Sequence, residues 1–190
     1  MSATGGPAGT PAADRPRQAP VLETERLVLR PFQARDLESL AALWADEEVV
    51  RFIGGQKLSR EDTWRRSLAA CGQWPYTGWG YWIVERKSDG AVIGQAGFAD
   101  FKRDMDPSIE GEPELGYVFS PLVHGQGIAF EACSAALRWA DRNLSASSYP
   151  AIISPDNAAS IRLAERLGFV RVPDASYRGE QIALFRRPRG

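Results

Sequence analysis

The pattern of apolar and polar positions changes its period several times along this chain. The two kinds of residue alternate over residues 26–32, which predicts a half-buried strand. Apolar residues at helical spacing follow over residues 34–50, with acids on the opposite face, and predict an amphipathic helix. A second helix is expected over residues 59–74, because Ser59 is a favourable N-cap and acids in the first turn complement the helix dipole.

The centre of the chain has the pattern of a sheet followed by a long helix. Residues 80–101 contain two β-rich runs joined by Ser-Asp-Gly, a turn signal, and so predict a hairpin. Residues 113–121 form another expected strand, which Pro121 ends. From Gly127 onward, apolar residues recur in one helical stripe that reaches Leu144.

The last part of the chain alternates between strand and helix. Residues 149–154 predict a short buried strand, and residues 156–168 predict a helix with Gly168 as its C-cap. Two more strands are expected over residues 169–172 and 177–187. This order implies an α/β (α+β) fold with a mixed sheet, because the strand, helix, strand units need parallel crossovers whereas the hairpins are antiparallel.

Length and composition are those of one domain. A chain of 190 residues with 44% hydrophobic content can bury one large core and is short for two. Residues 1–19 are rich in Ala, Gly and Pro and lack an apolar h-region, so we expect a disordered leader, either native or added for expression. The globular domain is therefore expected over residues 20–190.

Charge and cysteine content argue against several classes of protein. The chain has 23 Lys and Arg against 24 Asp and Glu, so no basic excess favours nucleic acid, and no stretch approaches the roughly 18 apolar residues of a membrane span. Cys71 and Cys133 lie far apart in apolar, helix-like surroundings, which indicates reduced thiols in a cytoplasmic protein. One histidine and no clustered cysteines make no convincing zinc site, so we expect no metal.

The stretch SPLVHGQGIAFEA, residues 120–132, joins an expected strand to the long helix. Its Gly125-Gln126-Gly127 turn allows positive φ and close approach of a ligand, and the helix behind it offers unpaired N–H groups. This combination predicts a pyrophosphate site, although the same residues also suit an ordinary turn. A dinucleotide fingerprint would need Gly or Ala where Phe130 stands, and a Walker loop would need a Gly-Lys-Ser/Thr that is absent.

The same stretch resembles the acyl-CoA pyrophosphate loop of the GNAT superfamily of N-acetyltransferases. That loop has Arg or Gln, two residues, Gly, one residue, then Gly or Ala; Gly127 and Ala129 match. His124 departs from the pattern, since the family has Arg or Gln there, or Trp in the RimJ/RimL-type branch of ribosomal-protein acetyltransferases. The resemblance covers residues 20–187, and further segments are similar to that branch in the same order: LETERLVLRPFQARDLESLAAL, VIGQAGF, ELGYVFSP and NAASIRLAERLGFVR.

The resemblance implies a fold and a cosubstrate. The fold would be a GNAT-like, mostly antiparallel twisted sheet of about seven strands flanked by four helices, with a splayed pair of parallel central strands. Acetyl-CoA would be the cosubstrate, with its pantetheine arm on the backbone of Tyr117, Val118 and Phe119 and on the side chain of Asn157. Its pyrophosphate would lie on the residues of the loop: His124, Gly125, Gln126, Gly127, Ile128 and Ala129.

Acetyl transfer to an amine needs a base to deprotonate the amine. Glu112 and Glu114 are two residues apart and so are expected on one face of the strand, where an apolar cleft would raise a carboxyl pKa. Glu114 is the favoured base, since it precedes Leu-Gly-Tyr as an acid does in the Rim-type pattern. Glu112, next to Pro113, would lie at the mouth of the strand near the acceptor. A solvated glutamate at a strand edge is the alternative for either residue.

The reaction also needs an acid for the departing thiolate. Many GNAT enzymes have a tyrosine seven residues after the position of Asn157, but this chain has Ala164 there. Ser160 lies on the same helical face as Asn157, resembles a serine of the Rim-type branch, and is the expected substitute. Asn157 is also a candidate N-cap.

Aromatic residues gather between the second helix and the hairpin. Trp74 and Tyr76 are expected on a loop bearing Pro and Gly, where they would wall the acceptor pocket. Trp79, Tyr81 and Trp82 are expected to pack in the core or at the sheet edge. The loop has no interleaved Lys or Arg, so a nucleic-acid stacking platform is not predicted.

The sequence therefore predicts an acetyl-CoA-dependent N-acetyltransferase that acts by direct transfer in a ternary complex. The acceptor would be a protein N-terminus or a small primary amine. The alternative is a non-catalytic acyl-CoA-binding module of the same fold, which the absent tyrosine and the unusual His124 permit. We expect a cytoplasmic monomer or homodimer with no nucleic acid or membrane partner.

Overall fold

The computed structural model describes residues 16–190, so the expected leader lies outside the described residues except for its last four positions. Ala19 is already buried in the main hydrophobic core. The described chain forms ten strands and five α-helices. In chain order these are β1 (Leu22–Glu23), β2 (Leu27–Arg30), α1 (Leu37–Trp44), α2 (Glu47–Val50), α3 (Arg60–Thr77), β3 (Tyr81–Arg86), β4 (Val92–Ala99), β5 (Met105–Asp106), β6 (Glu114–Phe119), α4 (Ile128–Asn143), β7 (Ser148–Ile153), α5 (Ala158–Arg166), β8 (Val170–Arg171), β9 (Ala175–Tyr177) and β10 (Glu180–Pro188).

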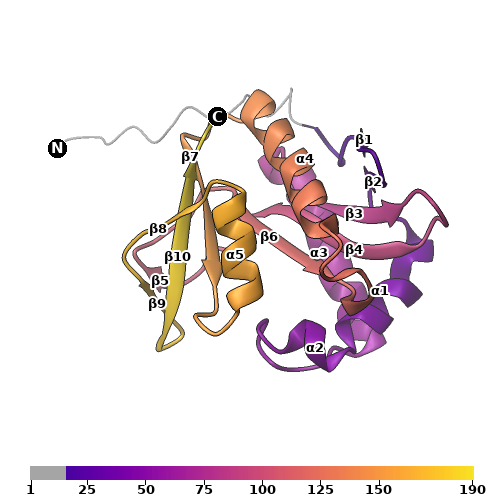
Figure 1. Cartoon of the computed structure of the whole chain (residues 1–190), viewed down its shortest axis with the longest axis horizontal. Helices are drawn as coiled ribbons and strands as arrows, with labels where there is room; N and C mark the ends of the chain where they lie inside the picture. The colour runs from indigo at the N-terminus through magenta and orange to yellow at the C-terminus, as the bar shows by residue number, and fades with distance from the viewer. Residues whose placement is uncertain (1–15) are drawn as a thin grey trace.

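Two antiparallel sheets meet at β6 and β7. The first has the strand order β1-β2-β3-β4-β6, and the second has the order β5-β9-β10-β7, with β8 also paired to β10. β6 and β7 are edge strands that lie next to each other, yet no ladder joins them in the described chain. Figure 1 shows β7 and β10 running steeply across the direction of β6. The predicted α/β fold with mostly antiparallel strands and diverging central strands is confirmed. The strands of the described chain form two sheets whose ladders are all antiparallel, because the predicted central pair, β6 and β7, splays apart without hydrogen bonding.

Alternation along β6 divides its side chains between two faces. Leu115 and Phe119 join the large core together with residues of α4. Val118 joins a smaller core formed with α1 and α2. Since side chains two apart share a face of a strand, Glu114 and Gly116 lie on the same face as Val118, toward α1.

The helix expected over residues 34–50 is interrupted, and this prediction is corrected. α1 ends at Trp44, and the backbone of Asp46 is extended. The Asp46 carboxylate then accepts a hydrogen bond of 2.8 Å from the Glu48 N–H and caps α2. Asp46, an N-cap residue within an apolar stripe, thus starts a second helix. The apolar periodicity alone predicts that the first helix continues through it.

The prediction that Trp74 and Tyr76 lie on a loop is wrong. α3 begins at its predicted cap but runs on through both residues to Thr77. Pro75 lacks an N–H and removes one helical hydrogen bond, yet the helix continues because Trp74 is anchored in the core. Gly78, with φ of 85°, ends the helix and donates to the Trp74 carbonyl oxygen at 2.9 Å.

Three tryptophans at the centre of the large core connect α3, β3 and α4. The rings of Trp74, Trp82 and Trp139 meet edge to face, with centroids 4.8, 5.3 and 5.2 Å apart. The indole N–H of Trp74 donates to the Tyr81 carbonyl oxygen at 3.1 Å, and that of Trp82 donates to the Pro20 carbonyl oxygen at 2.7 Å. The two fully buried indoles, Trp74 and Trp82, thus keep their N–H groups hydrogen-bonded, while Trp139 is only partly buried.

Candidate functional site

The turn between β6 and α4 has the geometry that its glycines predict. Gly125 and Gly127 adopt φ angles of 73° and 74°, in the left-handed region where other side chains are strained. Gly127 is the N-cap of α4 and makes no side-chain cap, and no described group accepts from the N–H of Ile128, Ala129 or Phe130. Three backbone donors and the positive end of a helix dipole are therefore available to an anion here.

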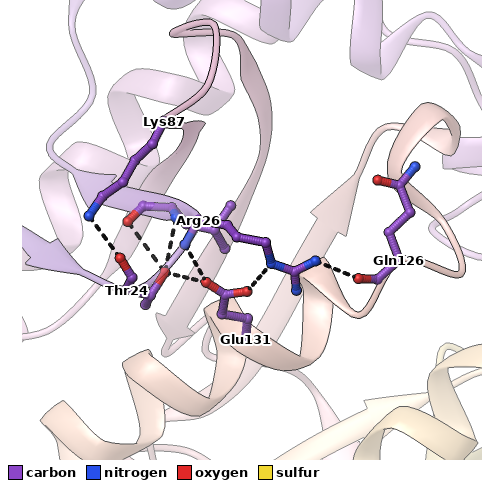
Figure 2. Close-up of polar contacts among 6 residues, drawn as sticks. Thr24, Arg26, Lys87, Gln126 and Glu131 are labelled. Carbon is purple, nitrogen blue, oxygen red and sulfur yellow. Dashed lines mark hydrogen bonds and ion pairs between the residues drawn. The ribbon is translucent and has the colours of Figure 1, made fainter.

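Arg26 connects this turn to the start of β2 (Figure 2). Its Nη1 donates to the Gln126 carbonyl oxygen at 2.8 Å, and its Nε donates to the Glu131 carboxylate at 2.6 Å. Glu131 also accepts from the Thr24 hydroxyl at 2.6 Å and from the Arg26 backbone N–H at 2.9 Å. Partial burial raises the pKa of Glu131, but these hydrogen bonds outweigh it and hold the pKa below its usual range. The acid in the first turn of α4 is thus neutralised.

Arg26 also orients one peptide of the turn. Because a peptide group is planar and trans, a Gln126 carbonyl aimed at Arg26 leaves the Gly127 N–H pointing the opposite way. The third guanidinium nitrogen, Nη2, lies 3.6 Å from the position that a Cβ on Gly127 would take. Arg26 therefore places a cation beside the turn and fixes the direction of a backbone donor within it.

The side chains of His124 and Gln126 turn back toward the entrance of the loop. His124 Nε2 lies 3.3 Å from the Phe119 carbonyl oxygen, and Gln126 Nε2 donates to the Leu122 carbonyl oxygen at 2.9 Å. Both residues are exposed. In this arrangement the two side chains hold the loop against the end of β6, and the backbone supplies the donors for an anion.

Tyr117 bridges the gap between the two sheets. Its hydroxyl donates to the Ser160 carbonyl oxygen, in the first turn of α5, at 3.3 Å. Asn157 caps that helix, since its Oδ1 accepts from the Ser160 N–H at 3.1 Å. Burial raises the pKa of Tyr117, so its hydroxyl stays protonated. Tyr117 and Asn157, predicted for the cofactor site, and Ser160, the predicted acid, are thus brought together beside the unpaired edge of β6.

Glu114 opens β6 and is buried on the α1 face. Arg103 binds its carboxylate through two hydrogen bonds of 2.7 and 3.0 Å and donates a third, of 3.1 Å, to the Tyr177 hydroxyl. Burial raises the pKa of Glu114 and the Arg103 ion pair opposes this, with a net shift upward. The predicted location, a carboxylate in apolar surroundings, is therefore present together with an arginine that the sequence did not reveal.

Glu112 does not share the face of Glu114, so that expectation is wrong. Pro113 separates it from β6, which begins only at Glu114. Its carboxylate pairs instead with Arg186 of β10, with one N–O distance of 2.9 Å. The two glutamates are consequently attached to different parts of the fold and do not act as a pair.

The two aromatic residues expected at the acceptor pocket have different environments. Trp74 is 2% exposed within the tryptophan cluster, so it is a core residue and offers no surface to a ligand. Tyr76 is 79% exposed on α3. The correction follows from the longer helix, which directs Trp74 into the core and Tyr76 away from it.

Sequence reasoning missed three residues next to this site: Arg26, Arg103 and Tyr81. Arg26 lies 105 residues from the acid that it binds, and Arg103 lies 11 residues from its own, so no local spacing reveals either pair. The sequence predicts only packing for Tyr81, whose hydroxyl oxygen lies against Gly116 of β6, two residues from Glu114. One local signal could have found it. The neighbouring strands β4 and β6 each contain glycine, and glycine within a strand often marks the close approach of another group.

Residues 16–190 contain neither a cluster of metal ligands nor a membrane-spanning helix. There, no group of three or more His, Cys, Asp or Glu side chains is placed to hold a metal ion. Nor does that part of the chain contain a helix with the length and apolar character needed to cross a membrane. Cys133 is buried and Cys71 partly buried, and both thiols are free.

Comparisons with known proteins agree with this geometry. A family model described as an acetyltransferase (GNAT) domain matches residues 26–170. The Bacillus subtilis (strain 168) protein YkkB, described as uncharacterized, is 31% identical over 171 residues, which cover 87% of this chain and 94% of YkkB. A solved structure described as a putative GNAT-family acetyltransferase from Bordetella pertussis is 31% identical, with a TM-score of 0.78. The match covers 89% of this chain and 99% of that protein. A ribosomal α-N-protein acetyltransferase, RimL, in complex with coenzyme A shares the fold at 15% identity and a TM-score of 0.71. The match covers 89% of this chain and 98% of RimL.

The turn of residues 125–129, called the anion-binding turn below for its free backbone donors, lies at a helix N-terminus beside the diverging strands β6 and β7. The family match includes the turn, both diverging strands and the capped helix α5. This chain belongs to the GNAT family of acetyltransferases.

Proposed function

We propose that this protein transfers an acetyl group from acetyl-CoA directly to a primary amine while both substrates are bound. One observation carries the proposal: the anion-binding turn lies at the end of β6, and the outer edge of that strand is unpaired. An extended ligand with phosphates at one end and amides along its arm fits this combination, because helix donors bind the first and a free strand edge binds the second.

The cosubstrate would be held mainly by backbone. Gly125, Gln126, Gly127, Ile128 and Ala129 would hold the pyrophosphate, and His124 would add a hydrogen bond at its rim through the ring nitrogen that does not face Phe119. The edge of β6 at Tyr117, Val118 and Phe119 would pair with the pantetheine amides, together with the Asn157 side chain. When bound, acetyl-CoA supplies the activated acyl group, and these residues orient it.

Glu114 and Ser160 are the proposed base and acid. Glu114 would take a proton from the amine through a water molecule, which suits a carboxylate whose pKa is raised. The Ser160 hydroxyl would give a proton to the departing thiolate, and Ser160 lies beside Tyr117 at the start of α5. The C–N bond forms as the C–S bond breaks, the amine loses one proton and the thiolate gains one.

The acceptor would approach from the face that carries Glu114. A cleft of about 510 Å³ opens between residues 101–106 and 176–179, and its lining includes Arg103, which binds the Glu114 carboxylate. A small amine or a protein N-terminus would enter this cleft, with Tyr76 and Glu112 as outer contacts. The sequence motifs support the RimJ/RimL-type branch, and the free thiols support a cytoplasmic location. The protein would act as a monomer or homodimer.

A thiol-release assay tests the proposal. Purified protein with acetyl-CoA is offered spermidine, kanamycin, an amino acid and a hexapeptide with a free N-terminus. Thiol release that requires one of these amines, with the acetylated amine identified by mass spectrometry, is the expected result.

The second candidate function is an acyl-CoA-binding module, which Ala164 at the usual tyrosine position favours. It would be preferred if acetyl-CoA raised the melting temperature while a wider panel of peptides and amines gave no turnover. If acetyl-CoA neither bound nor reacted, both functions would be rejected.

A further inference from the structure

The side chain of Tyr81 crosses the first sheet on the α1 face. Tyr81 of β3 pairs with Gly97 of β4, and Gly97 pairs with Gly116 of β6, so the three residues lie in one row across neighbouring strands. A Cβ on Gly116 would collide with the Tyr81 hydroxyl oxygen and would stand 3.1 Å from its Cζ. The phenol therefore reaches β6, the edge strand that borders the gap between the sheets, because both strands beyond it have glycine in that row.

The Tyr81 hydroxyl has no hydrogen-bond partner within the described chain, in contrast to the hydroxyl of Tyr117. Its charged neighbours are Glu114, which raises its pKa, and Arg66 and Arg103, which lower it; burial is the largest effect, and the net shift is upward. The group is therefore a neutral phenol. Among the described residues, the fully buried side-chain polar atom without a partner is the Tyr149 hydroxyl and not that of Tyr81, so the Tyr81 oxygen keeps some exposure to solvent and is accessible to a ligand.

Tyr81 and Glu114 meet on one stretch of β6. Gly116 is two residues from Glu114 on the same face, a spacing of roughly 7 Å along a strand. Tyr117, Asn157 and Ser160 lie toward the opposite face, with the anion-binding turn. The sheet thus separates the groups proposed for the cosubstrate from a second pair of polar groups, Tyr81 and Glu114.

We infer that Tyr81 is an acceptor-side catalytic residue whose hydroxyl oxygen accepts a hydrogen bond from the attacking amine. The inference rests on the proposed function and assigns the approach of the amine to the α1 face. In the transfer, one amine proton goes to Glu114, the C–N bond forms and the C–S bond breaks. Tyr81 keeps its own proton throughout, and its contact holds the nitrogen lone pair toward the carbonyl carbon.

Kinetics of Tyr81→Phe test this role, with whichever of spermidine, kanamycin, the amino acid or the hexapeptide wild type acetylates fastest. The expected result is at least about a tenfold loss in kcat/KM for that amine, while the KM of acetyl-CoA and the Kd of CoA stay within about twofold. Tyr149→Phe, which removes a buried hydroxyl on β7, is the control and should retain wild-type kinetics. Retained amine kinetics in Tyr81→Phe, or an equal loss of CoA affinity, would overturn the inference. Absence of turnover in wild type would reject the proposed function instead.

Thermal melting tests the position of the hydroxyl without any substrate. Gly116→Ala should lower Tm by about 3 °C or more, because its methyl group collides with the Tyr81 oxygen. In the Tyr81→Phe background the same substitution should lower Tm by less than half as much, since only a ring contact remains. Equal shifts in the two backgrounds would show that the hydroxyl does not lie over Gly116.

Discussion

Arg26 and Glu131 are 105 residues apart in sequence, yet Nε of the arginine lies 2.6 Å from the glutamate carboxylate at the point where the anion-binding turn enters α4. The pair has two effects on that turn. It neutralises an acid in the first turn of the helix, and it leaves Nη1 of Arg26 to bind the Gln126 carbonyl (Figure 2). A helix N-terminus binds an anion best when no uncompensated carboxylate lies beside it.

Arg26→Ala should therefore weaken cosubstrate binding more than it slows the chemistry. The variant loses the anchor of the Gln126 carbonyl and exposes the charge of Glu131 near the phosphates. We expect the Kd of CoA and the KM of acetyl-CoA to rise about tenfold, which corresponds to about 1.4 kcal/mol, with kcat within about twofold. Isothermal titration with CoA measures the first quantity, and initial rates give the others.

Lys87→Ala is the matched control, because Lys87 bonds the Thr24 carbonyl in the same network but has no contact with the turn. Its CoA affinity should equal that of wild type. Equal losses of CoA affinity in the two variants would assign the effect to general loosening of β1 and β2. Wild-type CoA affinity in Arg26→Ala would show that Arg26 does not contribute to cosubstrate binding.

Glu131 also makes the stability of this region dependent on pH. Its pKa is lowered in the folded protein, so its carboxylate contributes stability that is present above the unfolded-state value of 4.5 and is lost as pH falls through the lower folded value. Glu131→Gln should cost about 1 kcal/mol near pH 7, since it removes charged hydrogen bonds at a partly exposed site. The difference from wild type should shrink between about pH 5 and pH 3.

Urea denaturation of the two proteins across this range measures the difference. The free energies of unfolding should converge at the acidic end, where wild type is protonated too. A difference that stays constant with pH would show that Glu131 contributes by shape and not by charge.

The sequence predicted features of this site that depend on neighbouring residues alone. The turn glycines Gly125 and Gly127, the cap Ser59 and the cap Asn157 all act within four positions along the chain, so residue type and spacing specify them. The bonds of Arg26 were not predictable in this way, because its partners come near only after the strands and α4 have packed. Residue spacing also gives no information on how a carboxylate such as Glu114 is paired across a loop.

The end of α3 shows how packing can override a local signal. Pro75 normally favours the end of a helix, and the Pro and Gly nearby predicted a loop. The burial of Trp74 against two other tryptophans outweighs the lost hydrogen bond and carries the helix one more turn. Large apolar residues just before a proline are therefore a reason to extend a helix prediction past it.

Trp74→Ala tests this assignment to the core. Removing a fully buried indole should cost about 3–5 kcal/mol of folding free energy, whereas a residue on the wall of a pocket would cost much less. Leu68→Ala on the same helix, where the side chain is 49% exposed, should stay within about 0.5 kcal/mol of wild type. Urea denaturation of both variants measures the loss in free energy of unfolding. Small losses of similar size in the two variants would contradict the assignment of Trp74 to the core.

Glu114→Gln tests the base with the shape of the site preserved, because the amide is close in size to the carboxylate that Arg103 binds. A base acts in the chemical step, so we expect kcat to fall about 100-fold while the Kd of CoA changes by less than about twofold. Wild-type kcat/KM for the amine should rise with pH as Glu114 loses its proton, with a midpoint above the ordinary carboxyl value of 4.5, since burial raises the pKa of Glu114.

The pH profile separates this role from a structural one. Loss of an ion-pair partner would destabilise the protein and reduce the amount of active enzyme at every pH, without changing the shape of the profile. Loss of a base should remove the acidic limb from the residual activity of Glu114→Gln. If Glu114→Gln kept the acidic limb of the wild-type profile, another group would be the base. Glu114 would then serve to hold Arg103 beside Tyr177 at the cleft.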